Sequence, residues 1–401
     1  MVAASELEVA DVFRAYGGAY QARYGRSMPL RHWRVIEAIE QCRTAALGGH
    51  VYVCDRCGHE KVAYNSCRNR HCPKCQALAK ERWLQARRAE LLPIEYFHVV
   101  FTIPGALNPI VLRNQRVMYN ILFHAASETL QTIAADPKHL GARIGFMAIL
   151  HSWGQNLMDH PHLHCVVPGG GLSSDGERWL PCRRGFFLPV RVLSRLFRGK
   201  FLDGLRKARK SGDVIFPGEI RKFEDPSHFK KLMDDLYATE WVVYSKRPFG
   251  GPQQVLDYLG RYTHRIAISN HRLIRMEDDR VVFRWKDYAR GNRLGSMKLH
   301  AVEFIRRYLL HVLPHGFMRI RYYGLLANCH RSENLARCRQ LLGVHVEPPD
   351  TPERESWQEI LERLTGIDPT LCPVCGEGRL RCREVIPPAS GNEPHSARGP
   401  P

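Results

Sequence analysis

A run of five cysteines between positions 54 and 75 constrains the fold of this chain more than any other feature. The segment reads CDRCGHEKVAYNSCRNRHCPKC and holds two Cys-x2-Cys pairs, Cys54 with Cys57 and Cys72 with Cys75, separated by fourteen residues. Each pair can form a tight knuckle on Zn²⁺, and two knuckles complete the tetrahedral site of a zinc ribbon or treble clef. We therefore predict that these four cysteines bind one structural zinc ion.

Further cysteines and a histidine leave the ligand set open. Cys67 and His71 could each replace one of the four ligands or serve a second ion, and Cys67 could equally be a small buried apolar residue. Cys372, Cys375 and Cys382 could form a second zinc site completed by a histidine elsewhere, or be an unoccupied remnant. Thirteen cysteines without a visible secretory signal favour metal binding over disulfides.

The net charge indicates a polyanionic partner. Lys and Arg number 59 against 40 Asp and Glu, a formal charge of +19, which favours phosphate-rich partners, although the charge could serve solubility alone. Between Arg178 and Lys210 there are eleven basic residues and one acid. Four phenylalanines interrupt this run, as a nucleic-acid groove would require: Phe186, Phe187, Phe197 and Phe201.

Hydrophobic periodicity predicts an α+β fold. Two helical runs precede residue 48, a basic helix follows the cysteines, and strands are expected over 96–104, 145–157, 162–168 and 241–245. Several strand pairs are close enough for hairpins and no GxGxxG follows a strand, so we expect an antiparallel sheet with helices on one face. No run is long and apolar enough to span a bilayer, and a cytoplasmic protein is expected.

The stretch DHPHLHCVV, which begins at Asp159, places histidines on one face of a predicted strand. Alternation puts Leu163, Cys165 and Val167 on the opposite face, toward a core. Neighbouring same-face positions lie about 6.6 Å apart at ~3.3 Å per residue, so two adjacent histidines can reach one ion but all three hardly can. We therefore expect His162 and His164 to be the metal pair. Gln155, Gln254 and His160 remain candidates for the third ligand.

Two tyrosines one helical turn apart form the other half of a possible centre. VLDYLGRYTHRIA places Tyr258 and Tyr262 on one face of a predicted helix. Cationic or polar neighbours surround them and could contact DNA: Arg261, His264 and Arg265. Tyrosines at this spacing are most often packing residues. A phenol with pKa about 10 becomes a nucleophile only when nearby cations or a metal assist it.

These motifs together resemble the rolling-circle transposases of the insertion-sequence 91 family, a two-tyrosine group of the HUH superfamily. HPHLHCVVPGGGL is similar to the family's His-hydrophobic-His motif, and PFGGPQQVLDYLGRYTHRIAISNHRL to its tyrosine helix. SCRNRHCPKCQ and FHVVFTIP resemble its zinc segment and first catalytic strand. The resemblance spans about residues 30 to 330. It implies an HUH/RRM-like antiparallel sheet with the histidines on a central strand and the tyrosines on a facing helix.

The resemblance also implies a chemistry. One tyrosine attacks a single-stranded DNA phosphodiester at an element end and forms a 5′-phosphotyrosine, histidine-bound Mg²⁺ or Mn²⁺ polarises the phosphate, and the second tyrosine takes another strand. The family motif leaves open which tyrosine attacks first, and no oligomeric state is predicted. Association with the nucleoid during activity is expected.

From the residues alone, two other functions stay open. One is a non-catalytic, zinc-dependent DNA-binding regulator. The other is a metal hydrolase that activates water, although only Asp159 supplies a carboxylate beside the histidines.

We expect three regions. Residues 1–92 form a helical, zinc-binding DNA-recognition domain that presents Arg68 and Arg70 to DNA. Residues 93–330 form the catalytic domain, and residues 331–401 a C-terminal extension with the small cysteine cluster and a disordered tail.

Overall fold

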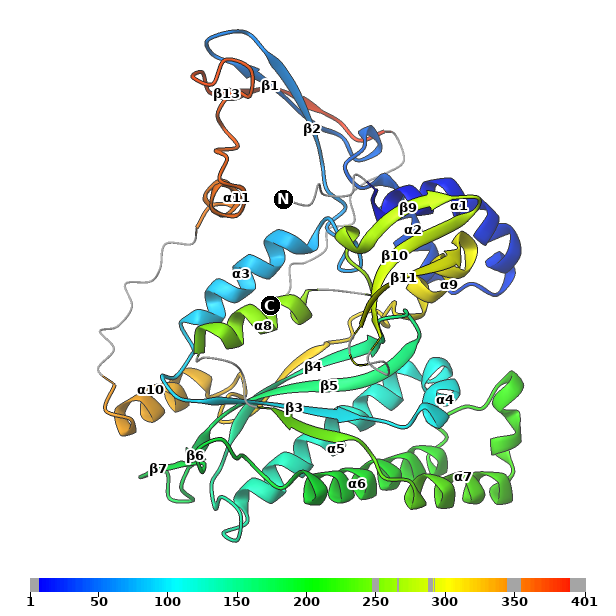
Figure 1. Ribbon diagram of the computed structural model, residues 1–401, viewed down its shortest axis with the longest axis vertical. Coiled ribbons are helices and arrows are strands. Elements are labelled where there is room, and N and C mark those ends of the chain that lie inside the picture. Colours follow the sequence, from blue (N-terminus) through cyan, green and yellow to red (C-terminus); the bar gives the residue numbers. More distant parts are fainter. Residues whose placement is uncertain are drawn as a thin grey trace.

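A five-stranded antiparallel sheet forms the centre of the molecule (Figure 1). The computed structural model describes residues 7–246, 252–264, 267–287, 291, 293–344 and 355–389. In spatial order the strands are β12 (Ile320–Gly324), β4 (Gly145–Trp153), β5 (Asp159–Pro168), β3 (Tyr96–Thr102) and β8 (Val243–Lys246). Every neighbouring pair among these five is antiparallel. The predicted α+β class is therefore confirmed.

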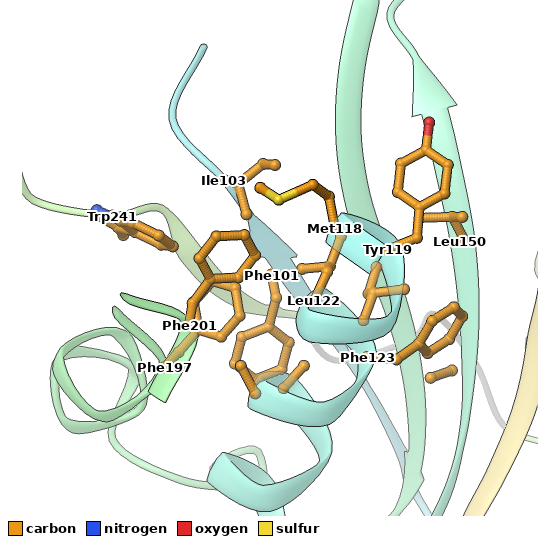
Figure 2. Close-up of a cluster of buried hydrophobic side chains, with 14 of the residues drawn as sticks. Phe101, Ile103, Met118, Tyr119, Leu122, Phe123, Leu150, Phe197, Phe201 and Trp241 are labelled. Atoms are coloured by element: carbon orange, nitrogen blue, oxygen red, sulfur yellow. The ribbon is translucent and has the colours of Figure 1, made fainter. Parts of the chain in front are cut away.

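One face of this sheet is covered by two long helices, α5 (Gln115–Ala135) and α6 (Val190–Lys210) (Figure 1). Strand alternation sends Leu163, Cys165 and Val167 of β5 into the core beneath these helices, as predicted. Figure 2 shows Phe101 of β3 beside Phe197 of α6, which in turn packs against Trp241. Each fully buried side chain of this size contributes about 1.5–3 kcal/mol to folding.

Helix α6 corrects one prediction. Phe187, Phe197 and Phe201, which the sequence pattern assigns to a nucleic-acid groove, are at most 5% exposed and belong to the core, whereas Phe186 is 49% exposed. The basic residues of α6, such as Arg195 and Lys210, lie on its solvent side. The alternation of cations and aromatics therefore reflects an amphipathic helix.

The opposite face of the sheet carries the histidines, and we call it the histidine face. Helices α3 (Gln76–Arg88) and α8 (Pro252–Thr263) lie over it (Figure 1). Val255 of α8 is 1% exposed and packs against residues of the three central strands: Tyr96, Met147, Ile149 and Val166. Helix α8 is thereby fixed above the sheet.

A second core lies beside the sheet and joins distant parts of the chain (Figure 1). It is built from α1 (Val9–Tyr24), α2 (Leu30–Gln41), α9 (Ala301–Leu310) and a sheet of β9 (Leu273–Glu277), β10 (Arg280–Asp287) and β11 (Arg293–His300). The β9–β10 connection is an acidic hairpin turn, and Asp278 and Asp279 both have positive φ, as a two-residue turn of type I′ requires.

The hairpin of β1 (Gly49–Cys54) and β2 (Glu60–Tyr64) and the C-terminal strand β13 (Leu380–Ile386), which are far apart in the sequence, meet in a third sheet. Strand β1 lies between β2 and β13, and α11 (Trp357–Thr365) packs on α3. The remaining elements are α4 (Asn108–Arg113), the β6 (Gly170–Leu172) and β7 (Trp179–Pro181) hairpin, α7 (Pro226–Ala238) and α10 (Arg331–Leu341). No helix in the described part of the chain could cross a membrane.

Candidate active site and metal centres

Three histidines from two adjacent strands converge on the histidine face. In the β4–β5 register, His151 lies directly opposite His162, and Ile149 opposite His164. The candidate ligand nitrogens of His151, His162 and His164 all lie within 4.8 Å of one another. The structure thus brings together the predicted pair and adds His151, which no sequence motif indicates. His160 is exposed and lies outside this group.

Each member of the predicted pair is held through one ring nitrogen. His162 Nδ1 lies 2.5 Å from the His160 carbonyl oxygen, so this nitrogen carries the proton and donates. His164 Nδ1 lies 2.8 Å from His98 Nε2 on β3. Metal-binding histidines characteristically donate their second nitrogen to such a partner, which fixes the ring and directs Nε2 to the ion. The donor set therefore fits a divalent metal.

Burial keeps the imidazoles of His98, His162 and His164 neutral. It lowers the pKa of His162 to about 3 and the pKa of His98 to about 4. Burial, with neighbouring histidines, also lowers the pKa of His164 well below its usual value. Only a neutral imidazole has a lone pair for a metal, so these rings are ready to ligate at pH 7.

Tyr258 connects α8 to the histidine group. Its hydroxyl lies 3.3 Å from His98 Nδ1, and the two rings meet at a centroid distance of 4.9 Å. Because His98 Nε2 contacts His164, His98 links the tyrosine to a candidate metal ligand. Tyr262 follows one turn later on the same helix, but its side chain and that of Arg261 lie outside the described atoms.

Helix α8 is positioned by close packing at both its centre and its end. At Gly260, between the two tyrosines, a Cβ would lie 2.8 Å from Leu84 Cδ1 of α3, so any side chain here would force Leu84 to move. At the C-terminus of α8 the buried Arg319 guanidinium donates to the carbonyl of Thr263. This contact satisfies a terminal carbonyl and complements the negative end of the helix.

The predicted DNA contacts have different environments. Arg68 is exposed, whereas Arg70 donates to the Phe317 carbonyl at 2.9 Å and is shielded enough to lower its pKa. His264 packs near Trp83, and burial lowers its pKa to about 3, so it is not a cation at pH 7. These placements disagree with DNA-contact roles for Arg70 and His264. Arg265 lies outside the described residues.

The predicted four-cysteine zinc site is wrong in its grouping. One cluster contains Cys42, Cys67, Cys72 and Cys75, and another contains Cys54, Cys57, Cys372 and Cys375. The physical reason is the β1–β2 hairpin: Cys54 and Cys57 lie at its tip, and the five residues of β2 carry the chain back about 16 Å before Cys67. One zinc ion cannot span that distance.

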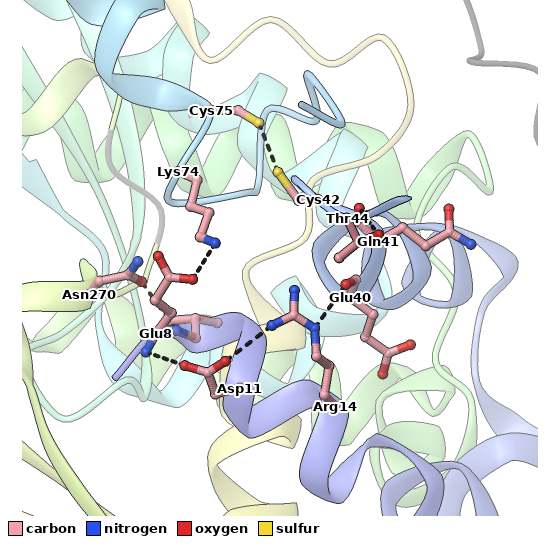
Figure 3. A network of polar contacts seen from close by, with 11 residues as sticks. Glu8, Asp11, Arg14, Glu40, Gln41, Cys42, Thr44, Lys74, Cys75 and Asn270 are labelled. Carbon is pink, nitrogen blue, oxygen red and sulfur yellow. Dashed lines mark hydrogen bonds and ion pairs between the residues drawn. The ribbon is translucent and has the colours of Figure 1, made fainter. Parts of the chain in front are cut away.

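The first cluster connects α2 to the cysteine-rich loop. Cys75 Sγ lies 3.6 Å from Cys42 Sγ and 3.5 Å from Cys67 Sγ (Figure 3 shows Cys42 facing Cys75). A tetrahedral zinc site with Zn–S bonds of about 2.3 Å has S–S edges of about 3.8 Å, so the four thiols fit structural Zn²⁺. Cys42 lies alone in the sequence, without a Cys-x2-Cys partner, so no local spacing identifies it as a ligand.

His71 is a structural residue. Its Nε2 accepts from the Leu313 backbone N–H at 3.3 Å, and its Nδ1 lies 3.1 Å from Asn69 Oδ1. Both ring nitrogens are thus engaged, and His71 belongs to neither cysteine cluster.

Comparisons with known proteins identify the family of the chain. A family model described as "Transposase zinc-binding domain" matches residues 12–103, and one described as "Putative transposase" matches residues 145–333. The "Putative transposase y4qJ" of Sinorhizobium fredii is 55% identical over 391 residues, which cover 97% of this chain and 98% of that protein. The "Transposase for insertion sequence element IS801" of Pseudomonas savastanoi pv. phaseolicola is 27% identical over 338 residues, 84% of this chain and 79% of that protein. No solved structure matches. With its zinc-binding and transposase regions both matched, the chain belongs to the insertion-sequence transposases of the IS91 family.

Proposed function

We propose that this transposase cleaves and rejoins single-stranded DNA at element ends through a covalent 5′-phosphotyrosine, with Tyr258 as the first nucleophile. The observation that carries the proposal is the connection from the Tyr258 hydroxyl through His98 to His164 within the histidine group. A packing tyrosine needs no such connection. A nucleophile does, because its phenol must lose a proton beside the phosphate.

His151, His162 and His164 would hold the metal, which would polarise a phosphate oxygen and neutralise charge in the transition state. The donor set is three nitrogens. Nitrogen donors suit Mn²⁺ better than Mg²⁺, which prefers oxygen ligands. Of the two ions that the family resemblance implies, we therefore propose Mn²⁺.

The proton positions follow from this ligand set. If His164 ligates through Nε2, its Nδ1 carries the proton and donates to His98 Nε2. The proton of the neutral His98 must then lie on Nδ1, and the Tyr258 hydroxyl lies 3.3 Å from this nitrogen and 3.4 Å from Nε2. His98 therefore donates to the tyrosine oxygen and stabilises the phenolate, instead of acting as the base.

In the reaction, Tyr258 Oη loses its proton to solvent and bonds to phosphorus, while the bond from phosphorus to the 3′ oxygen breaks and that oxygen takes up a proton from solvent. The freed strand ends in a 3′-OH. The phosphotyrosine preserves the energy of the original phosphodiester, so attack by a later 3′-OH reverses the step without an external energy source. Tyr262, one turn further along α8, is proposed to take the second strand of a rolling-circle transfer.

An adduct assay tests this proposal. The protein is incubated with Mn²⁺ and single-stranded oligonucleotides carrying the element ends, and the adduct that survives denaturation is measured. We expect Tyr258→Phe to lower the adduct at least about 100-fold, or roughly 3 kcal/mol in barrier, and His162→Ala or His151→Ala to remove it. Tyr262→Phe should keep the first cleavage but reduce strand transfer.

Exposed residues of the same types provide the controls. Tyr237→Phe on α7, where the tyrosine is 57% exposed, and His139→Ala should both behave as wild type. Wild-type adduct in the Tyr258→Phe/Tyr262→Phe double variant would exclude the proposal. Cleavage without an adduct would indicate a hydrolase, and binding of the correct ends without cleavage would indicate a regulator.

A further inference from the structure

The second cysteine cluster joins the two ends of the chain. Cys54 and Cys57 lie within the matched zinc-binding region, whereas Cys372 and Cys375 lie beyond both matched regions. We propose that these four cysteines bind a second structural zinc ion, which closes a ribbon between the chain ends and holds the C-terminal arm, residues 355–389, against α3.

The two halves of the cluster have the same local structure. CDRCG and CPVCG each form a knuckle in which the glycine N–H bonds to the first cysteine carbonyl, at 3.1 Å for Gly58 and 3.0 Å for Gly376. Both glycines have positive φ, 72° and 70°, a conformation that L side chains rarely adopt. The sharp turn of each knuckle directs its two thiols to one side, as a zinc ribbon requires.

The sulfur positions fit a metal and do not fit disulfides. Cys54 Sγ lies 3.7 Å from Cys375 Sγ, and Cys57 Sγ lies 3.6 Å from Cys372 Sγ. Tetrahedral zinc predicts edges of about 3.8 Å, whereas a disulfide has a length of about 2.05 Å. Backbone N–H groups also point at the sulfurs, at 3.4 Å from Cys57 to Cys54 and 3.3 Å from Gly378 to Cys375. Such donors stabilise thiolates, the form that binds zinc.

Gly378 allows the two knuckles to come close enough to share one metal ion. A Cβ at this position would lie 2.3 Å from Cys54 Sγ and 2.8 Å from Arg56 Cβ. The second knuckle can therefore approach the first only because residue 378 has no side chain. Asp55 also exchanges bonds with Arg379: its N–H donates to the Arg379 carbonyl at 3.0 Å, and its carboxylate accepts from the Arg379 N–H at 2.7 Å.

The ribbon sheet has little core of its own. Most side chains of β2 and β13 are exposed, including Val62 at 48% and Val385 at 63%. A sheet that buries so little apolar surface needs another source of stability, and metal binding supplies it in many small domains. The proposed zinc thus explains why β13 remains paired with β1.

The arm contacts the helix that supports α8. Arg363 of α11 lies 3.5 Å from the carboxylate of Glu81, a buried residue of α3. Helix α3 in turn packs against α8 through Leu84 and Gly260. Zinc at the chain ends is therefore expected to stabilise the support beneath the tyrosine helix.

The proposal does not depend on strand cleavage, because its test counts thiolate-bound metal. The full chain is loaded with Co²⁺, and the sulfur-to-cobalt charge-transfer absorption is measured per chain. The histidine group has no thiolate and does not contribute. We expect two tetrathiolate sites in wild type, and half of this absorption in Cys372→Ser/Cys375→Ser. Gly378→Ala should give the same loss although all its cysteines remain.

Matched controls are Cys382→Ser and Cys329→Ser, both exposed cysteines outside the clusters, which should keep the wild-type absorption. Hydrogen exchange supplies a second readout: amides of Leu380–Ile386 should exchange at least tenfold faster in the ligand variants, while those of β3 and β5 should not change. A single tetrathiolate site in wild type would overturn the proposal, as would two sites in Cys372→Ser/Cys375→Ser. The wild-type count decides even if the variants do not fold.

Discussion

At the residue scale, the proposed role of His98 as a hydrogen-bond donor to Tyr258 can be tested directly. The structure places His98 between Tyr258 and His164, with a pKa lowered to about 4 by burial. It is therefore neutral in the folded protein above about pH 5 and can donate one N–H to the tyrosine. Loss of a hydrogen bond to a charged group costs about 1.5–3 kcal/mol. We expect His98→Phe, which keeps a ring but no nitrogen, to slow adduct formation about 10- to 100-fold.

The pH profile separates this role from simple packing. Without the donor, the pKa of Tyr258 should rise above the usual value near 10, so the variant should recover activity relative to wild type as the pH increases from about 9 to 11. A constant ratio over that range would indicate a packing defect, and a wild-type rate would exclude the role. Stability provides an independent check. Because burial depresses the pKa of His98, the unfolded state binds more protons between about pH 6.5 and 4, and stability falls as the pH decreases through this window. His98→Phe should weaken that decrease.

The sequence alone predicts only part of the histidine group. Alternation along one strand was sufficient to select His162 and His164 and to send Leu163 and Cys165 to the core. It could not supply His151 or His98, because their proximity depends on the register of β4 and β3 against β5. That register is set by tertiary packing, and neither residue lies in a local motif.

At the scale of elements, the contact between α8 and α3 determines where the tyrosines lie. Gly260→Val would place side-chain atoms against Leu84, which a Cβ alone already approaches to 2.8 Å. Valine is a slightly better helix former than glycine, by a few tenths of a kcal/mol, so propensity and packing predict opposite effects. We expect packing to dominate and the adduct to fall about tenfold or more as α8 moves away from α3.

A helical glycine in open space provides the matched control. At Gly18 of α1 a Cβ would meet no atom within 4 Å, so Gly18→Val should leave activity unchanged and stability the same or slightly higher. Adding Leu84→Ala to Gly260→Val should restore part of the activity, because it removes the clashing atoms. Full activity in Gly260→Val alone, measured by the adduct assay, would contradict the proposed role of this contact.

Helices and strands could be predicted where a local hydrophobic pattern alone determined them. Helix and strand positions followed from periodicity, and the strand predicted over 162–168 lies within β5, which begins three residues earlier at Asp159. The groove prediction for the aromatics of α6 was wrong because charge and aromatic content carry no information on helical phase. Phe197 and Phe201 are four residues apart and face the core together.

At the scale of the whole molecule, the grouping of cysteines into two clusters could not be predicted, because each cluster joins cysteines that are far apart in the sequence. Adjacent Cys-x2-Cys pairs predicted one site, but the stiff β1–β2 hairpin separates them, and each pair finds its partners elsewhere. Cys42 comes from the end of α2, and Cys372 and Cys375 come from the other end of the chain. Fold closure brings these ligands together, and no local spacing reveals it.

The two clusters also differ in what they support. The first borders the second core, in which Cys72 is 1% exposed and the Tyr308 hydroxyl of α9 donates to the His71 carbonyl. From this core Arg307 reaches the Asn156 carbonyl at 3.0 Å, and His311 Nε2 lies 3.1 Å from the Leu157 carbonyl. These contacts hold the turn between β4 and β5, the strands that carry the candidate metal ligands. The second cluster joins the C-terminal arm to the β1–β2 hairpin and reaches α3 only through α11.

Loss of the first zinc should therefore be much more damaging than loss of the second. We expect Cys72→Ser to destabilise the protein by more than about 3 kcal/mol, since structural zinc contributes directly to folding free energy, and to weaken Mn²⁺ binding at the histidine group. Cys372→Ser should cost less and leave Mn²⁺ affinity within about twofold of wild type. Calorimetry and Mn²⁺ titration measure the two effects, with the exposed Cys329→Ser as control. Equal losses of stability and Mn²⁺ affinity in Cys72→Ser and Cys372→Ser would contradict this expectation. Such a result would show that the zinc ribbon and the second core unfold as one unit, because each zinc would then support the same set of contacts.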